Sequence, residues 1–330
     1  MLIIFQIIFK SFFFNKKWML WSWGGGLLLI FSLLIQVSIT VQINEWYKGF
    51  YDLLQNATKS NISEFWNKIY VFCYLAFPYV LLATFTGFFT RVYSLRWREA
   101  ITFDYIPLWK NSLENVEGAS QRIQEDTSRF AKIVESLGLQ VIRGIMTLIA
   151  FIPILWGLSS GIQIDFLKQF PGSLVWVSLF VSLGGLIISW FVGIKLPGLE
   201  YNNQRVEASF RKELVYGEDD RLKYAKPDTV FELFSGIKFN YHRLFYNYGY
   251  FDVWVNLYDQ FMVIVPYLVM APSLFTGAIT LGVIVQVSNA FQRVHNSFSL
   301  FIHQWTTITE LRSIHKRLGE FEIAIGYKKN

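Results

Sequence analysis

Long apolar blocks alternate with basic segments along this chain, and that alternation restricts its fold more than any other feature. Six blocks are each about 20 or more residues long, the length that a helix needs to cross the hydrocarbon core of a bilayer. Backbone groups in lipid have no water partners, which favours helices because they satisfy their own hydrogen bonds. The sequence therefore predicts an all-α membrane protein with six transmembrane helices. The blocks cover approximately residues 18–43, 65–90, 137–158, 174–194, 248–271 and 276–301.

The distribution of positive charge predicts the orientation of these helices. Of the 30 Lys and Arg residues, 25 lie in the N-terminal segment, in the connections after the second and fourth blocks, and in the C-terminal segment. The alternate connections hold four, at Lys48, Lys59, Lys68 and Lys168. Because basic loops remain on the cytoplasmic side, we expect both termini to be cytoplasmic.

The connections on the predicted cytoplasmic side are long and helical in pattern. They cover about residues 91–132 and 195–247, so we expect spans two to five to extend as helices well beyond the membrane. Residues 1–17 are apolar but interrupted by Lys10, too short to span, and are expected to lie at the membrane interface. Residues 18–330 then form a single six-helix domain. This arrangement matches one half of an ABC exporter, and such halves work as pairs, so a homodimer in contact with membrane lipid is expected.

Several classes of function have no motif in the sequence. A phosphate-binding loop of the form G-x-x-x-x-G-K-[ST] does not occur, so the chain has no nucleotide site of that kind. The four histidines lack metal-ligand spacing, and Cys73 is the single cysteine. We expect no metal, no cofactor other than protons as coupling ions, no nucleic-acid partner and no enzymatic activity.

The sixth block carries a stripe of polar residues at spacings of three and four. Such groups are costly at membrane depth unless they face protein or water. One interpretation is the wall of a hydrated cavity that binds a peptide-like ligand; the other is hydrogen bonding between helices. We favour the cavity, because the stripe is long and rich in amides. Its members are Gln286, Asn289, Gln292, Arg293, Asn296 and Gln304.

Two charged residues inside predicted spans add to the candidate cavity. Arg143, in the third block, must find a carboxylate elsewhere in the protein or face water. Asp259, in the fifth block, shares a helical face with Asp252 and Asn256. We expect Arg143 and Asp259 to influence the polarity of the cavity.

Three cytoplasmic carboxylates repeat at helical spacing. Glu200, Glu207 and Glu218 are 7 and 11 residues apart and would share one face of a continuous helix. Like charges in a row favour proton uptake and suit a proton relay. The alternative is a salt-bridged face, since Glu207 and Arg211 are four residues apart.

Two cytoplasmic runs resemble a known family. The stretch from Leu95 to Ala100 (LRWREA) and the stretch from Gly118 to Phe130 (GASQRIQEDTSRF) resemble the first cytoplasmic loop of the SbmA/BacA peptide transporters. Peroxisomal fatty-acyl exporters share a looser form of this pattern. Residues 145–151, 192–220 and 277–321 also resemble the SbmA/BacA family, so the resemblance covers nearly the whole chain.

This resemblance implies an inner-membrane homodimer with an ABC-exporter-like fold and no nucleotide-binding domain, which imports peptides, including antimicrobial peptides, on the proton gradient. It also implies that matching acidic residues couple transport to protons. They are Glu125, Glu135, Glu200, Glu207, Glu213 and Glu218. Arg143 and Asp259 depart from the family pattern, which has uncharged residues there. Longer family members carry extra N-terminal helices, whereas this chain begins just before the six-span core; if those helices shape substrate access, its substrate range differs.

The sequence thus predicts a proton-driven peptide importer of the bacterial inner membrane. A second hypothesis is the membrane half of an ABC transporter whose ATPase is a separate chain. A third is a membrane scaffold without transport activity.

Overall fold

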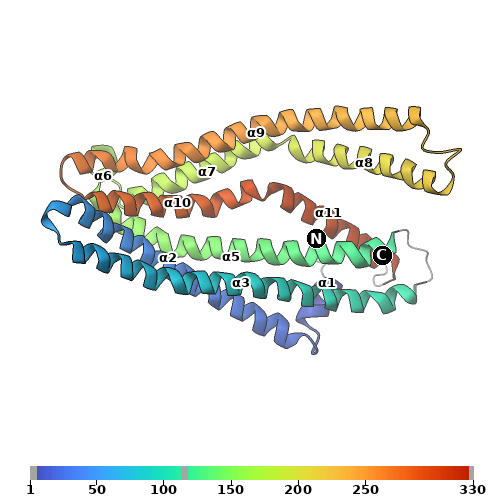
Figure 1. Cartoon of the computed structure of the whole chain (residues 1–330), viewed down its shortest axis with the longest axis horizontal. Helices are drawn as coiled ribbons and strands as arrows, with labels where there is room; N and C mark the ends of the chain where they lie inside the picture. The colour runs from blue at the N-terminus through green and yellow to red at the C-terminus, as the bar shows by residue number, and fades with distance from the viewer. Residues whose placement is uncertain (1–5, 113–117, 327–330) are drawn as a thin grey trace. The chain divides into compact units, whose positions relative to one another are not determined.

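The computed structural model describes residues 6–112 and 118–326, and within these ranges every regular element is a helix. Figure 1 shows the long helices in order along the chain. Short π- and 3₁₀-helical turns lie between some of the α-helices. The α-helices are α1 (Gln6–Phe13), α2 (Gly26–Gln55), α3 (Ile62–Lys110), α4 (Ala119–Gln121), α5 (Thr127–Leu158), α6 (Asp165–Lys168), α7 (Ser173–Gly193), α8 (Leu196–Asp219), α9 (Pro227–Phe275), α10 (Leu281–His303) and α11 (Trp305–Ala324). The π-helices are η1 (Leu20–Gly25) and η3 (Arg122–Asp126), and the 3₁₀ turns are η2 (Ala57–Lys59) and η4 (Ser159–Gly161).

Five helical runs among the described residues are long and apolar enough to cross a membrane. They are Leu20–Gln55, Ile62–Lys110, Ala119–Gly161, Ser173–Asp219 and Pro227–Phe275. The predicted sixth span is present as the 23-residue helix α10, but the polar stripe lowers its hydropathy, and it is not among the five. The chain is therefore a multi-pass helical membrane protein, and the sixth crossing stays a prediction.

The helices continue well past the apolar blocks. α3 has 49 residues, which at 1.5 Å per residue is about 74 Å, more than twice the thickness of the hydrocarbon core. It begins where Asn61 Oδ1 accepts a hydrogen bond from the Ser63 N–H (3.2 Å), and it contains Pro78 and Pro107. α8 and α9 likewise occupy most of the predicted 195–247 connection. The side of the membrane on which these extensions lie, and the location of the termini, stay predictions.

The chain divides into two compact units. Unit one comprises Met1–Leu179 and Val265–Asn330, and unit two comprises Phe180–Ile264. The predicted single domain over 18–330 stays a prediction.

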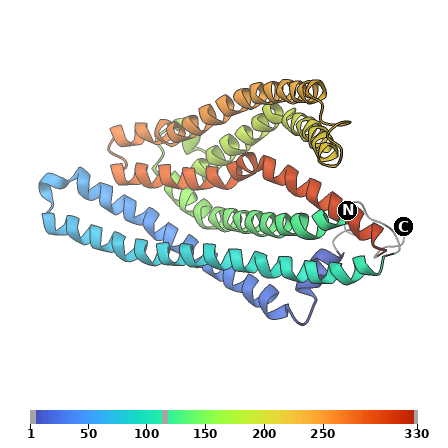
Figure 2. The same cartoon turned by 45° about the vertical axis from the view of Figure 1, so that its right-hand side comes forward.

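Unit one contains a bundle of α2, α3, α5 and α10. In Figure 1 and Figure 2, α2 crosses α3 at an angle and diverges from it toward the N-terminal end of α2. Residue contacts join α2, α3 and α5 to one another and α10 to α2 and α5. The first turn of α10 is held by α2, because Gln55 Oε1 accepts from the Leu281 N–H (2.8 Å) and Asp52 Oδ1 from the Gly282 N–H (3.1 Å). These bonds satisfy N–H groups that a helix start leaves without partners.

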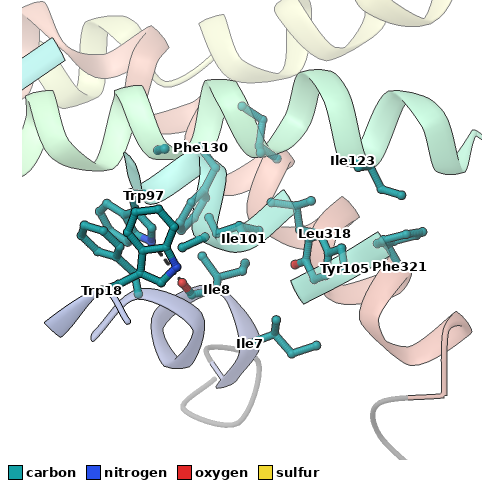
Figure 3. Packing of buried hydrophobic residues seen from close by; sticks show 14 of the residues in the cluster. Ile7, Ile8, Trp18, Trp97, Ile101, Tyr105, Ile123, Phe130, Leu318 and Phe321 are labelled. Carbon is teal, nitrogen blue, oxygen red and sulfur yellow. Dashed lines mark hydrogen bonds between the residues drawn. The ribbon is translucent and has the colours of Figure 1, made fainter. Parts of the chain in front are cut away.

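A hydrophobic cluster joins α1, α3, η3, α5 and α11 at one end of this bundle. Figure 3 shows Trp97 of α3 pointing at α1, where its indole N–H donates to the Ile8 carbonyl (3.1 Å). At the other side of the cluster, the Tyr105 ring of α3 meets the Phe321 ring of α11 edge-on, with centroids 5.4 Å apart. α1 is thus anchored on protein through buried Ile7, Ile8 and Phe12; its predicted place at the membrane interface is not tested by this packing.

Within unit two, α7 and α9 pack through a small residue and two aromatic rings. Gly185 lies directly against the ring of Tyr258, whose hydroxyl donates to the Val181 carbonyl (3.1 Å). The Trp254 indole N–H donates to the Ser189 hydroxyl (2.8 Å). A side chain at position 185 would displace the Tyr258 ring, so glycine is required by this close approach.

Candidate functional site

A network of polar side chains, three of them buried and one exposed, links α2, α3 and α5 in the middle of the bundle. The Gln36 amide nitrogen donates to the Thr86 hydroxyl (2.8 Å) and to the Ser32 hydroxyl (3.3 Å), and Ser32 and Thr86 share a further hydrogen bond of 2.5 Å. The amide oxygen of Gln36 accepts from Arg143 Nη2 (2.9 Å). We call Ser32, Gln36, Thr86 and Arg143 the polar network. Gln36 organises it, because one amide supplies both donors and acceptor.

The polar network answers the question of the partner of Arg143. Its hydrogen bond goes to a neutral amide, while the residue as a whole is exposed. No ion pair joins Arg143 to a carboxylate among the described residues. That its guanidinium faces water inside the membrane stays a prediction.

Glu135 lies on α5 two turns before Arg143, and it is the most deeply buried of the six predicted coupling carboxylates. Only 7% of the residue is exposed, and its Oε1 has no hydrogen-bond partner in the part of the chain that the structure describes. A buried carboxyl without a cation beside it is costly to keep ionised. Its protonation state therefore depends on whether water and protons reach it.

The other predicted coupling residues occupy different surroundings. Glu200, Glu207 and Glu218 all fall within the continuous helix α8, so their spacing does place them on one face. Glu207 and Arg211, both described, form no ion pair, contrary to the alternative of a salt-bridged face. Glu125 is paired with Arg129 (2.7 Å).

Glu213 has a structural contact in unit two. Its Oε1 accepts a hydrogen bond from the Ala225 N–H (2.9 Å) across the turn between α8 and α9. Ala225 has a positive φ of 52°, and its Cβ faces Gly217. Glu213 therefore holds the turn closed, and it lies on the side of α8 away from Glu200, Glu207 and Glu218.

The polar stripe of α10 is divided between two environments. Arg293 and Asn296 are exposed, and Asn296 accepts a hydrogen bond from the Gln292 amide (2.9 Å). Asn289 is half-buried. Gln304 donates to Gln140 of α5 (3.3 Å), which is the interhelical bonding of the alternative interpretation. The interpretation as interhelical hydrogen bonding thus describes Gln304, and the cavity interpretation of the exposed members stays a prediction.

The buried end of the stripe faces an amide that the sequence analysis missed. Gln286 is 7% exposed with an unpartnered Oε1, and Asn44 of α2 is 3% exposed with both amide atoms unpartnered among the described residues. One turn away on each helix, Gly282 packs against the Lys48 carbonyl, so the two amides are at the same level. Asn44 lies just past the predicted end of the first apolar block, next to Gln42 and Glu45, where a polar residue is expected and does not by itself indicate a buried site.

Asp259 belongs to unit two and is half-buried on α9. Asp252 and Asn256 on the same helix are exposed, and the Asn256 amide donates to the Asp252 carbonyl (2.7 Å). Their shared face is consistent with the predicted spacing. Whether Asp259 and the residues of unit one line one cavity stays a prediction.

The strongest ion-pair cluster in unit one was not predicted. Asp126 is 1% exposed and binds Arg317 of α11 at two positions (2.7 and 3.0 Å) and Arg122 at 2.9 Å. Hydrogen bonds to Asp126 raise the pKa of Arg317 above its ordinary value. The π-helix η3 ends at Asp126. The detectable signal was the i, i+4 spacing of Arg122 and Asp126 in the QRIQED run.

No set of three or more His, Cys, Asp or Glu side chains that could hold a metal ion occurs within residues 6–112 and 118–326.

Comparison with known proteins places the chain in a family. The sequence pattern of the SbmA/BacA-like family matches residues 15–326. The chain belongs to this family. The resemblance of the cytoplasmic runs to SbmA/BacA proteins is thereby confirmed, and this SbmA/BacA-like chain is a membrane protein of a transporter family.

Curated relatives of this SbmA/BacA-like chain are named as ABC transporters. The inner membrane ABC transporter ATP-binding protein YddA of Escherichia coli is 28% identical over 89% of this chain and 56% of its own length. The chloroplastic ABC transporter D family member 2 of Arabidopsis thaliana is 27% identical over 89% of this chain and 42% of its own length. An uncharacterized ABC transporter ATP-binding protein of Synechocystis is 25% identical over 93% of this chain and 47% of its own length. The chain spans about half the length of these relatives.

Proposed function

We propose that this chain is one half of a homodimeric transporter that carries peptides across the bacterial inner membrane into the cell on the proton gradient. Glu135 is the observation that carries the proposal. It combines burial, a carboxyl oxygen without a partner, and a position on the same helix as the exposed Arg143.

Proton binding at Glu135 would change the stability of the bundle in one state relative to another. When a chamber open to the outside hydrates Glu135, the carboxylate is ionised; protonation removes the charge and allows α3 and α5 to close around it. One proton moving down 100 mV is worth about 2.3 kcal/mol, so one or two protons can shift a two-state dimer.

The substrate side of the proposal rests on the outward part of the stripe. Asn289, Arg293 and Asn296 offer donors and acceptors that suit a peptide backbone, and Arg143 adds a positive charge. Within unit two, the α8 carboxylates Glu200, Glu207 and Glu218 would pass protons along one helical face, and Asp259 would add a negative charge to α9. Within unit one, Gln286 would tune the polarity of the chamber.

The deciding experiment is uptake of a labelled peptide into proteoliposomes with an imposed pH gradient and no nucleotide. Wild-type protein should accumulate the peptide, and Glu135→Gln should reduce the gradient-driven uptake at least tenfold while the protein still assembles. The matched control is Glu64→Gln, which changes an exposed carboxylate in the first turn of α3. Undiminished uptake by Glu135→Gln contradicts the role of Glu135.

One observation favours a second candidate function. Two of the relatives reported above are named as ATP-binding proteins and are about twice as long as the region that matches this chain. The chain would then be the membrane half of an ABC transporter whose ATPase is supplied separately. This candidate is supported if uptake requires ATP and a second, nucleotide-hydrolysing subunit and does not depend on the pH gradient. The same result rejects the proton-driven importer.

A further inference from the structure

A groove of about 430 Å³ lies between α1 and the second half of α3, away from the polar network. It is lined by residues of both helices and of the segment that follows α1, including Lys10, Asn15, Phe103, Asp104 and Pro107. This volume falls in the range of small-molecule sites. None of the proton-coupling or cavity residues named above lines it.

Charges of both signs border this groove without pairing. Lys10 is exposed and Asp104 is half-buried, and neither forms an ion pair among the described residues. Lys17 is a further cation whose field acts on Asp104. A ligand that carries both a negative and a positive group fits such a groove better than a simple anion or cation.

Pro107 supplies a third feature. A proline has no N–H, so the usual helical hydrogen bond from position 107 to the Phe103 carbonyl cannot form. Phe103 and Pro107 both line the groove, next to Asp104. A carboxylate and a carbonyl that has lost its usual donor are two acceptors that a primary ammonium group, with three N–H donors, can satisfy together.

The rim of the groove is apolar and close to a membrane-spanning helix. Phe14 is 74% exposed and Phe103 is 62% exposed. The first spanning run begins at Leu20, five residues after Asn15, so the groove edge is within about 17 Å of that span. Met19 and Leu20, 55% and 83% exposed, are further apolar side chains at the start of that span.

From this combination we infer that the α1–α3 groove binds the headgroup of a zwitterionic phospholipid with a primary amine, of the phosphatidylethanolamine class. The phosphate binds Lys10, the ammonium donates to Asp104 and to the Phe103 carbonyl, and the acyl chains run over Phe14 toward Leu20. A choline headgroup has the phosphate but no N–H donor, so the groove should prefer ethanolamine to choline.

The preference can be measured by native mass spectrometry of the purified full chain with phosphatidylethanolamine and phosphatidylcholine in competition. Wild type should bind phosphatidylethanolamine at least fivefold more strongly. Asp104→Asn should remove the preference, whereas Lys10→Gln should weaken both lipids alike, because both carry a phosphate. Pro107→Ala should reduce the preference about twofold without lowering the thermal midpoint, since it restores a helical N–H.

Controls and an opposing result make the test decisive. Asp228→Asn and Lys316→Gln change exposed charges outside the groove and should leave the preference unchanged. Soluble phosphoethanolamine should bind at least tenfold more weakly than the lipid. Equal binding of the two lipids by wild type, a full preference in Asp104→Asn, or phosphoethanolamine binding as strong as that of the lipid would overturn the inference.

Discussion

Arg317 of α11 binds Asp126 of η3 through two hydrogen bonds, from Nε to Oδ2 at 3.0 Å and from Nη2 to Oδ1 at 2.7 Å. The residues are 191 positions apart in the sequence. Arg122 contacts the same carboxylate, and Arg129 of α5 is paired with Glu310 of α11 (3.0 Å). α11 is thus attached to the start of the third spanning run by charge as well as by the hydrophobic cluster.

Loss of the buried carboxylate should destabilise unit one. Asp126→Asn leaves Arg122 and Arg317 without their counter-charge, and since both arginines remain partly hydrated we expect a cost of about 2–3 kcal/mol. Thermal unfolding in detergent micelles measures the change. The control is Lys316→Gln on α11, which removes an exposed pair with Glu320 (3.9 Å) and should change stability by about 0.5 kcal/mol or less. Equal shifts for the two variants would contradict the prediction.

The polar network should depend on Gln36 more than on any neighbouring amide of α2. Gln36→Leu removes one hydrogen-bond partner of Thr86 and the Gln36 partner of Arg143, and it should lower stability by about 1–3 kcal/mol, because polar groups in the bundle lose hydrogen bonds. Gln42→Leu, at an exposed position of the same helix, is the matched control. Thermal midpoints of the two variants decide the matter, and a Gln36→Leu protein as stable as the control would rule out the network as a structural element.

Two residues with positive φ should respond in opposite directions to exchange of alanine and glycine. Ala225 has a φ of 52°, a conformation that costs an alanine about 1 kcal/mol, so Ala225→Gly should stabilise unit two. Gly277 has a φ of 74° and open space around it, so Gly277→Ala should destabilise by about 1 kcal/mol through the backbone alone. Chemical denaturation reports both changes, and shifts of the same sign would refute the assignment to backbone strain.

His315 should make stability depend on pH. Burial lowers the pKa of His315 below its ordinary value of 6.5. The unfolded chain therefore binds a proton more readily than the folded one, and the stabilisation is present above pH 6.5 and is lost as the pH falls through the lowered pKa. Thermal midpoints between about pH 7.5 and 5.5, roughly one unit either side of 6.5, measure this. His315→Gln should flatten the profile, and the exposed His242→Gln should not.

The approximate positions of the spanning helices were predictable, because a long apolar block is recognisable in the sequence by itself. The residues at which the helices end were not predictable in this way. The first block was predicted to end at about residue 43, yet α2 continues to Gln55 through Glu45, Lys48 and Asp52. Charged residues leave lipid without leaving a helix, so hydropathy marks where the membrane interior ends and not where the helix does.

The candidate site was predictable only as a set of residue types. The spacing of Glu200, Glu207 and Glu218 on one helix could be read from the sequence, since it depends on local periodicity alone. The contact of Glu213 with Ala225 crosses a turn, and the burial of Glu135 depends on tertiary packing. Local sequence patterns predict neither this contact nor this burial. They also do not predict the ion pair between Asp126 and Arg317, whose residues are 191 positions apart.

The break at Gln304 separates the last helix from the one before it. α10 ends at His303, and Gln304 has a φ of −97° and a ψ of 13°, so its backbone departs from helical geometry between α10 and α11, although its N–H still donates to the Leu300 carbonyl (2.9 Å) and its carbonyl accepts from the Ile308 N–H (2.9 Å). A rigid rod would transmit every tilt of α10 to the final segment. A change of backbone geometry at that position lets α11 follow its own direction and bind Asp126 through Arg317, so the direction of α11 is set by its contacts with η3 and α5 as well as by the direction of α10.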